Sequence, residues 1–411
     1  MNLAVDLHSH SGYAGGVGTI LLEDISLTMK KKGIDVFGTG DVLLPQRYLE
    51  LEEMLFDCGN GLYKLSPQDK SSFLLQTEVI LTLKLPAYKN RIVAHHIILF
   101  PDFISVKKCA KLMDKWGQKN TIGRPFIVSD NREQMIKRLN EIISIHPDIE
   151  IIPAHIMTPD GVLGCKNMLS SIEEFYGSFL PNIHVVETGL SADPELLEQI
   201  PGISNLTFIS NSDCHSSALN RVGREFTILD VKSISYSDII NSIRENNVVL
   251  TAEFNPAEGR YFKTGHSAKR HTNKEEFLIE PKNASDLICP ICQKRMTLGV
   301  FDRVKQLRDL NIVPLKRKAL HLIPLVEVIA NSLSLKSVTS TKVTKVYEEI
   351  IRHFTTEIRL WLASDQEIRE LLDKFIPAET LNAILAVKAE RFEFLPPGYD
   401  GEYGKLVINK K

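Results

Sequence analysis

Histidines and carboxylates recur at the ends of short apolar runs along the first 255 residues, and this pattern restricts the fold more than any other feature. The runs are typical of buried strands and lie at 3–7, 34–40, 73–80, 93–100, 149–155, 183–188, 206–213 and 248–253. Stretches with helical periodicity separate several of them, at 22–32, 105–117, 131–144, 168–177, 193–200 and 236–246. Strands that alternate with helices predict parallel βαβ units, and this many of them predict a barrel or near-barrel.

Polar side chains end or follow nearly every expected strand. In a parallel α/β barrel the carboxyl ends of the strands meet on one face, where the chemistry takes place. Imidazole and carboxylate groups together suit zinc, manganese or iron. The candidates that we expect on this face are His8, His10, Asp41, Glu78, His96, His155, Glu187, Asp213 and His215.

Each of these residues alone has a simpler interpretation. The histidines of HSH at 8–10 could be solvated, His155 could be a hydrogen-bonded core residue, and Asp213 and His215 could belong to a turn. Their recurrence on at least six strands favours one shared metal site over so many separate coincidences.

A second group of metal-binding side chains follows the expected barrel. His266 and His271 have four residues between them, and Cys289 and Cys292 have two. Two short chelating loops joined by a spacer predict a four-coordinate zinc site that stabilises a segment too small to hold its own core. The alternative is that the cysteines form a turn and the histidines are solvated.

These features divide the chain of 411 residues into three parts: a barrel at 1–255, a zinc-binding segment at 256–300 and a helical domain at 301–411. The scattered cysteines, apart from the pair at 289 and 292, are typical of a reducing compartment. The sequence has neither a signal-peptide pattern nor an apolar run of about 20 residues, so we expect a cytoplasmic protein away from membranes.

In order along the chain, DLHSH, GTGD, a strand-borne Glu, HxIxF, PAH and NSDCH resemble the PHP (polymerase and histidinol phosphatase) family. The resemblance implies a distorted (β/α)7 barrel with two or three divalent metals, which could be Zn, Mn, Mg or Fe. It assigns metal ligation to His8, His10, Glu78, His96, His155, Asp213 and His215, and a substrate-facing or supporting role to His95 and Glu187. Asp41 stands where many members carry His, and SGYAGG stands where many carry an Asp.

The whole chain is similar to the endonuclease Q family. The similarity is carried by the motifs GTGDVLLP, QTEV, HHIILFP, IIPAH, ETGLSAD, NSDCHS and RVGREF, which are followed by a zinc-binding segment and a helical tail. It departs in having one close cysteine pair instead of two. The resemblance implies cleavage of DNA 5′ to uracil, hypoxanthine, xanthine or an abasic site, with His8, His10, Glu78 and Asp213 as catalytic residues. Glu78, in the middle of the ligand series, is the expected bridging carboxylate.

DNA contacts are expected at basic residues away from the metals. Arg221 and Arg224 follow the last ligand loop, and LKRKAL at 315–320 and the tail from 398 are further candidates. The helical domain is only slightly basic, so a solvated face is the alternative there. A replication clamp is one candidate protein partner.

Two other functions remain open from the sequence. A PHP-type phosphatase acting on a small phosphorylated metabolite would be expected to end near residue 255, and this chain continues for more than 150 residues. A barrel that had become a binding module would be expected to lack several ligands, whereas only Asp41 and the missing aspartate depart from the pattern.

Overall fold

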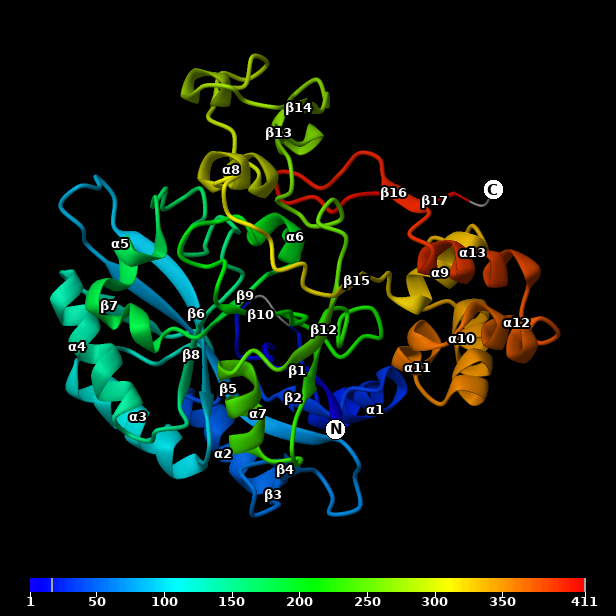
Figure 1. Ribbon diagram of the computed structural model, residues 1–411, viewed down its shortest axis with the longest axis horizontal. Coiled ribbons are helices and arrows are strands. Elements are labelled where there is room, and N and C mark those ends of the chain that lie inside the picture. Colours follow the sequence, from blue (N-terminus) through cyan, green and yellow to red (C-terminus); the bar gives the residue numbers. More distant parts are fainter. Residues whose placement is uncertain (16–17, 410–411) are drawn as a thin grey trace.

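Three groups of elements are visible in the computed structural model, which describes residues 1–15 and 18–409 (Figure 1). A strand-rich body carries the zinc-segment strands and helix α8 above it, and a helical group lies to its right in this view. The last two lysines of the basic tail, at 410 and 411, and the glycine at 16 lie outside the described residues.

The main sheet has the order β15-β12-β11-β1-β2-β5-β4-β3, with β6, β7 and β8 attached beside β5, and β9 pairs with β10 separately. The bounds are β1 Asn2–Asp6, β2 Val36–Gly38, β3 Phe56–Asp57, β4 Tyr63–Lys64, β5 Ser72–Leu83, β6 Ile92–Phe100, β7 Phe126–Ser129, β8 Glu150–Pro153, β9 Val185–Glu187, β10 Thr207–Ile209, β11 Phe226–Asp230, β12 Val248–Glu253 and β15 Ala319–His321. Each of the eight expected strands is present, and the sequence pattern missed five others in this sheet: β3, β4, β7, β11 and β15.

Helices cover the outside of this body. They are α1 Leu22–Lys32, α2 Pro45–Met54, α3 Phe103–Lys115, α4 Arg132–Ile143, α5 Ile172–Tyr176, α6 Pro194–Leu197 and α7 Tyr236–Arg244. Side chains at the N-caps define several of their starts, because Asp102, Asn131 and Ser235 each accept a hydrogen bond from the backbone N–H three residues on.

The mixed α/β class is confirmed, but neighbouring strands are not all parallel. β1 pairs in parallel with β2 and β2 with β5, whereas β5 with β6, β6 with β8 and β1 with β11 are antiparallel. The β5–β6 connection is a short loop, which cannot make the crossover that a parallel pair needs. Within the described residues no ladder joins β8 to β9, so the sevenfold barrel repeat stays a prediction.

The inward-facing residues of the strands nevertheless meet in one apolar cluster. It contains alternate residues of β1, such as Leu3 and Val5, together with side chains from β2, β5, β6, β8, β9, β10 and β11. Helix α7 contributes Ile239, Ile240 and Ile243 to the same cluster. The hydroxyl of Tyr236 on α7 donates to the carbonyl of Asp148, just before β8, so this helix lies at the amino end of that strand. The polar residues that follow the strands therefore gather at the other end.

The remaining residues form the zinc segment and the helical group. β13 Thr264–His266 pairs with β14 Phe277–Ile279, and α8 spans Val300–Leu307. The helices α9 Leu325–Ser332, α10 Thr341–Phe354, α11 Glu357–Leu362, α12 Asp365–Leu372 and α13 Ala378–Lys388 follow, with a hairpin of β16 Phe392–Phe394 and β17 Leu406–Ile408. The three-part division of the chain remains our proposal. Among the described residues, no helix is both long and apolar enough to cross a membrane.

Candidate active site

The loop after β1 is tied to the loop after β10, and this brings two histidines beside Asp213. The buried carboxylate of Asp6 accepts hydrogen bonds from the backbone N–H groups of Ser212 and Gly223, each at 2.9 Å. The backbone N–H of Leu7 donates to the side chain of Asn211 at 2.6 Å. Nε2 of His10 consequently lies 3.2 Å from Oδ1 of Asp213.

Four buried polar atoms at this point lack a hydrogen-bond partner among the described residues: Nε2 of His8, Nε2 of His10, Oε2 of Glu78 and Oδ1 of Asp213. They face one another, with Nε2 of His10 3.5 Å from Oε2 of Glu78 and Nε2 of His8 3.7 Å from Oδ1 of Asp213. Atoms that each lie about 2.1 Å from one cation are separated by roughly these distances. Buried polar atoms without partners are costly, and divalent cations held by overlapping sets of these atoms would satisfy them.

The opposite ring nitrogens of both histidines contact carboxylates. Nδ1 of His8 lies 3.0 Å from Oε1 of Glu187, and Nδ1 of His10 lies 3.3 Å from Oδ1 of Asp41. A carboxylate in this place fixes the orientation of a metal-binding imidazole. The expectation that Asp41 is itself a ligand therefore needs correction. Its other oxygen, Oδ2, accepts from the backbone N–H and the hydroxyl of Ser11, so the carboxylate is held behind His10.

The antiparallel register of β5 and β6 decides which of two adjacent histidines enters the site. Glu78 lies opposite Ile97 and Ile80 opposite His95, so His95 projects from the same face as Glu78. Nδ1 of His95 lies 2.8 Å from Oε1 of Glu78. The structure thus places His95, and not the expected His96, among the candidate ligands.

His96 projects from the other face of β6 into a buried aromatic environment. Its Nε2 lies 2.6 Å from the hydroxyl of Tyr176, and its ring stacks on Phe175 with centroids 5.5 Å apart. Burial lowers the pKa of His96 to about 3. The prediction that His96 binds metal is contradicted by this orientation.

His155 and His215 complete the cluster. Nε2 of His155 lies 3.4 Å from Oε1 of Glu78, and the ring of His215 lies against that of His10 with centroids 4.4 Å apart. Three groups of candidate ligand atoms therefore share members: His8, His10 and Glu78; Glu78, His95 and His155; and His10, Asp213 and His215. Asp41, His155 and Asp213 all have positive φ, at 56°, 30° and 43°, which is strain of the kind that gathers at functional sites.

Glycine is required next to His155. Gly189 lies two residues after Glu187 and has a φ of 75°. A Cβ atom added at position 189 would lie 2.4 Å from the Cβ of His155. Any larger residue at 189 would displace the imidazole.

The charges of the cluster show why it needs cations. Burial by itself lowers the pKa of His8, but the carboxylates of Glu187, Asp213 and Glu78 outweigh it and raise the pKa to about 9. For His10, Asp213, Asp41 and Glu78 likewise overcome burial and raise the pKa to about 10. Burial raises the pKa of Glu78 and of Asp213, yet the surrounding histidines hold both below their usual range. The carboxylates stay ionised and draw positive charge, either protons or metal.

A pocket of about 250 Å³ opens over the cluster. Its lining combines Glu78, His95, His155, Asp213 and His215 with Arg124, Thr158, Asp160, Gly189, Leu190, Ser191, Arg224, Arg260, Tyr261 and Tyr403. Nη1 of Arg124 lies 3.8 Å from Oε2 of Glu78. Arg124 and Arg260 come from stretches without regular periodicity, so the sequence pattern did not reveal them, whereas Tyr403 belongs to the tail from 398 that was named as a candidate for DNA contact.

The two arginines predicted to contact DNA have different positions. Arg224 is buried and donates from Nε to the carbonyl of Ser212 at 2.8 Å, so it braces the loop that carries Asp213. Arg221 is partly exposed and lies over the ring of Tyr403, with 5.6 Å between guanidinium and ring centroid. Arg260 lies over the same ring, also at 5.6 Å.

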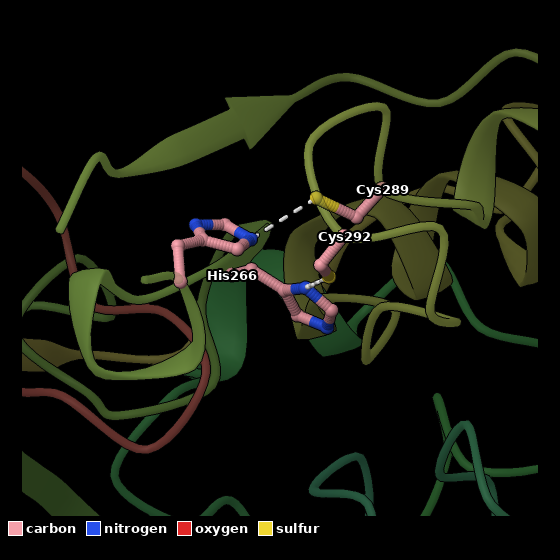
Figure 2. Close-up of side chains that lie close together, drawn as sticks. His266, Cys289 and Cys292 are labelled. Atoms are coloured by element: carbon pink, nitrogen blue, oxygen red, sulfur yellow. Dashed lines mark hydrogen bonds between the residues drawn. The ribbon is translucent and has the colours of Figure 1, made fainter. Parts of the chain in front are cut away.

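The four residues expected to bind zinc lie close together in the zinc segment (Figure 2). Nε2 of His271 lies 3.2 Å from Sγ of Cys289, and Nδ1 of His266 lies 3.4 Å from Sγ of Cys292. The second nitrogen of His266 faces the carbonyl of Arg295 at 3.2 Å, and that of His271 faces the carbonyl of Glu275 at 2.7 Å. Each carbonyl fixes one ring nitrogen as a donor and leaves the other for the cluster.

Burial raises the pKa of the Cys289 thiol, but backbone N–H groups and the two histidines outweigh it and lower the pKa to about 6. The candidate ligand atoms lie within 4.8 Å of one another. Thiolate and imidazole in this arrangement fit a closed tetrahedral zinc site.

No protein-family model matches the chain. It is similar to the lesion-specific endonuclease PfuEndoQ of Pyrococcus furiosus, with 27% identity and a TM-score of 0.82 over 99% of this chain and 96% of that one. A structure of Endonuclease Q in complex with a 27-mer duplex, with an abasic lesion at the active site, gives 26% identity and a TM-score of 0.83 over 100% and 97% of the two chains.

An uncharacterized protein of Methanocaldococcus jannaschii is 32% identical over 248 residues. These residues are 58% of this chain and 30% of that protein, so the chain spans less than a third of that relative's length.

Proposed function

We propose that the chain is a member of the endonuclease Q family, a metal-dependent DNA endonuclease that hydrolyses the phosphodiester 5′ to a deaminated base or an abasic site. The observation that carries the proposal is the set of four unpartnered ligand atoms of His8, His10, Glu78 and Asp213, which lies beneath an open pocket. A likeness over nearly the whole of both chains to an endonuclease with lesion DNA at its active site supplies the substrate class.

Two or three divalent ions (Zn, Mn, Mg or Fe) would be held by the three overlapping ligand groups. Such ions would lower the pKa of a water molecule bound to them and would neutralise charge on the phosphate. Glu78 directs one oxygen toward His10 and the other toward His95 and His155, so it is suited to bridge two ions. Glu187 and Asp41 hold His8 and His10 in position.

Arg124 is the residue that we assign to the scissile phosphate. Its guanidinium is about a third exposed, lines the pocket and is the cation nearest to Glu78 that is not an imidazole. An Arg fork can bind two phosphate oxygens and would counter the charge that develops there. Arg124→Gln should therefore slow cleavage while metal content stays unchanged.

A flipped nucleotide would enter the pocket above the metals. Two segments that follow ligand-bearing strands, 157–167 and 189–193, contribute Thr158, Gly189 and Ser191 to its lining. Uracil, hypoxanthine and xanthine carry a carbonyl where their parent bases carry an amino group, so hydrogen-bond donors here would favour deaminated bases. The Tyr403 ring also lines the pocket, and the guanidinium groups of Arg221 and Arg260 that lie over it could bind flanking phosphates.

End-labelled duplexes with a single deoxyuridine, deoxyinosine, deoxyxanthosine or abasic site test the proposal, beside an undamaged duplex and with Mg²⁺, Mn²⁺ or Zn²⁺ added. We expect a nick 5′ to each lesion that leaves a 3′-hydroxyl, and no nick in undamaged DNA. Asp213→Asn should be inactive although folded. Rapid hydrolysis of a small phosphomonoester, without cleavage of any lesion duplex, would instead identify a metabolite phosphatase. A replication clamp as partner stays a prediction.

A further inference from the structure

A fully buried carboxylate that the proposed mechanism does not use lies at the end of β12. Glu253 is 0% exposed and is the last residue of that strand. Within residues 1–15 and 18–409 it neither lines the active-site pocket nor belongs to a group of candidate metal ligands. A carboxylate buried so completely is costly unless hydrogen bonds compensate it, so its partners indicate what it does.

Glu253 accepts hydrogen bonds from two hydroxyl groups. Oγ of Ser210 donates to Oε1 at 2.5 Å, and Oγ1 of Thr188 donates to Oε2 at 3.1 Å. The two hydroxyl oxygens are themselves 2.7 Å apart. Thr188 directly follows β9 and Ser210 directly follows β10, so a carboxylate from a third strand joins the ends of both. Two donors, one on each oxygen, suit the ionised form of the carboxylate.

Glu225 fixes the end of β12 from the neighbouring strand. In the antiparallel register of β11 and β12, Phe226 lies opposite Ala252, which places Glu225 opposite Glu253. Oε1 of Glu225 accepts a hydrogen bond from the backbone N–H of Phe254 at 2.9 Å. The backbone on which Glu253 stands is therefore held in place directly after it.

The two facing carboxyl groups need not both be ionised. Burial and the charge of Glu253 raise the pKa of Glu225 well above its usual value, so Glu225 keeps its proton at neutral pH. Burial also raises the pKa of Glu253, to about 7, although the hydroxyls of Ser210 and Thr188 oppose the rise. Above this pH Glu253 is the member of the pair that carries the charge.

The other faces of β9 and β10 carry the side chains that hold candidate ligands. Side chains alternate along an extended chain, so Glu187 and Asn211 project away from the hydroxyls that Glu253 binds. Glu187 lies 3.0 Å from Nδ1 of His8 and accepts from the backbone N–H of His155 at 2.8 Å. Asn211 donates to Glu187 at 2.9 Å. A shift of either strand end would consequently move both histidines.

We propose that Glu253 is a positioning residue of the metal site, because its carboxylate holds the ends of β9 and β10 together and thereby fixes Glu187 on the opposite face. Glu253 acts through Thr188 and Ser210 and not by contact with the ions. The inference rests on the proposed function in taking His8 and His155 as metal ligands, so metal binding tests it apart from cleavage.

Glu253→Leu removes both acceptor oxygens, and Thr188→Val removes one donor with little change in shape. Titration of apo-protein with Mn²⁺ at pH 8 gives the Kd, and initial rates on an abasic duplex at saturating Mn²⁺ give kcat. We expect the Kd of Glu253→Leu to rise by about 10-fold or more, the effect of losing contacts that orient a metal-binding histidine. The kcat at saturating Mn²⁺ should stay close to that of the wild type, because the occupied site is the same. If Glu253→Leu does not fold, Thr188→Val must raise the Kd by itself.

Glu150→Leu is the matched control. Glu150 is also a buried carboxylate with two partners, His184 at 3.0 Å and Arg244 at 2.6 Å, but it lies at the start of β8. Its loss should lower the free energy of unfolding and leave the Kd for Mn²⁺ unchanged. Glu253→Gln keeps the volume and one acceptor oxygen, and it should recover most of the affinity that Glu253→Leu loses.

Glu253→Leu and Glu187→Gln should not be additive, because both changes act on the same link between strand ends and histidines. The double variant should bind Mn²⁺ only slightly more weakly than the weaker of the two single variants. Additive losses in log Kd, or an unchanged Kd in folded Glu253→Leu, would overturn the inference. Cleavage of lesion DNA by the wild type is scored separately. If the wild type cuts no lesion but the Kd values change as expected, the proposed function falls and the positioning role of Glu253 remains.

Discussion

Oε1 of Glu187 lies 3.0 Å from Nδ1 of His8, and Oε2 of Glu187 accepts a hydrogen bond from the backbone N–H of His155 at 2.8 Å. Asn211 also donates to Oε1 of Glu187, at 2.9 Å. A single carboxylate at the end of β9 thus joins the loops that follow β1, β8 and β10. The positions of two candidate ligands, His8 and His155, depend on it.

Glu187→Gln should therefore weaken metal binding without unfolding the protein. The glutamine amide has one oxygen that can accept a hydrogen bond, so either the ring nitrogen of His8 or the backbone N–H of His155 loses its acceptor. Loss of such a contact to a metal-binding histidine reduces metal affinity by about 10-fold to 100-fold. Titration of apo-protein with Mn²⁺, followed by activity and by bound metal, measures the effect. Glu195→Gln, an exposed neighbour on α6, is the matched control, and equal metal affinity in the two variants would contradict the role.

His95→Ala and His96→Ala should have opposite consequences. His95 contacts Glu78 in the cluster, so its loss should reduce cleavage by at least about 100-fold with little change in Tm. His96 fills a buried site, and its removal leaves the hydroxyl of Tyr176 buried without its partner. We expect His96→Ala to lower the free energy of unfolding by about 1–3 kcal/mol and to keep its activity while folded. Chemical denaturation and initial rates on the same preparations separate the two effects.

The contrast between these neighbours shows how far sequence patterns could predict the site. His8, His10, His155 and Asp213 follow the ends of strands, where the direction of the chain alone brings side chains to a common face. His95 is different, because the face on which it lies depends on the register of β6 against β5. That register is set by a hairpin loop and by packing across the sheet, neither of which is visible in a local pattern.

Asp41 and Arg124 illustrate two other limits. For Asp41 the position after β2 was predicted well, but the direction of its carboxylate is set by Ser11, which occupies one oxygen. Arg124 lies in an irregular stretch that reaches the site through tertiary packing, with its neighbour Gly123 close against Asp41. Six helices and eight strands of the first 255 residues could be predicted because their hydrophobic periodicity is local. Strand β11 was missed for the reason that applies to Arg124, because its antiparallel place beside β1 depends on a long-range contact.

The contact between β15 and α6 should depend on pH. His321 on β15 lies 2.9 Å from Asp193, the N-cap residue of α6, and 3.5 Å from Glu390. Burial lowers the pKa of His321, but these two carboxylates outweigh it and raise the pKa above its usual value. A raised pKa means that the protonated form stabilises the fold. This stabilisation is complete below the unfolded pKa of about 6.5 and is lost as pH rises through the folded value.

His321→Gln should accordingly destabilise the protein more at pH 6 than at pH 9. Urea denaturation of wild type and variant at both values gives the difference in the free energy of unfolding. Asp193→Asn removes the partner and should flatten the same pH dependence. A difference that grew with pH would show that His321 stabilises the fold as the neutral imidazole.

Cys289→Ser/Cys292→Ser should remove one zinc per chain and leave the metals of the candidate active site in place. The serine hydroxyl does not ionise near neutral pH, so neither replacement can act as the anionic ligand that thiolate provides. The paired strands β13 and β14 hold few buried apolar side chains, and without metal we expect their amide protons to exchange quickly. The change should extend to the tail, because Arg270 pairs with Asp400 at 2.8 Å. Mass spectrometry of the native protein counts the metals, and hydrogen exchange locates the loosened segment. Cys58→Ser, which changes a cysteine far along the chain, should affect neither readout. If the double variant retained its full zinc content and the protection of β13, Cys289 and Cys292 would not be zinc ligands, and the order of the segment would not depend on them.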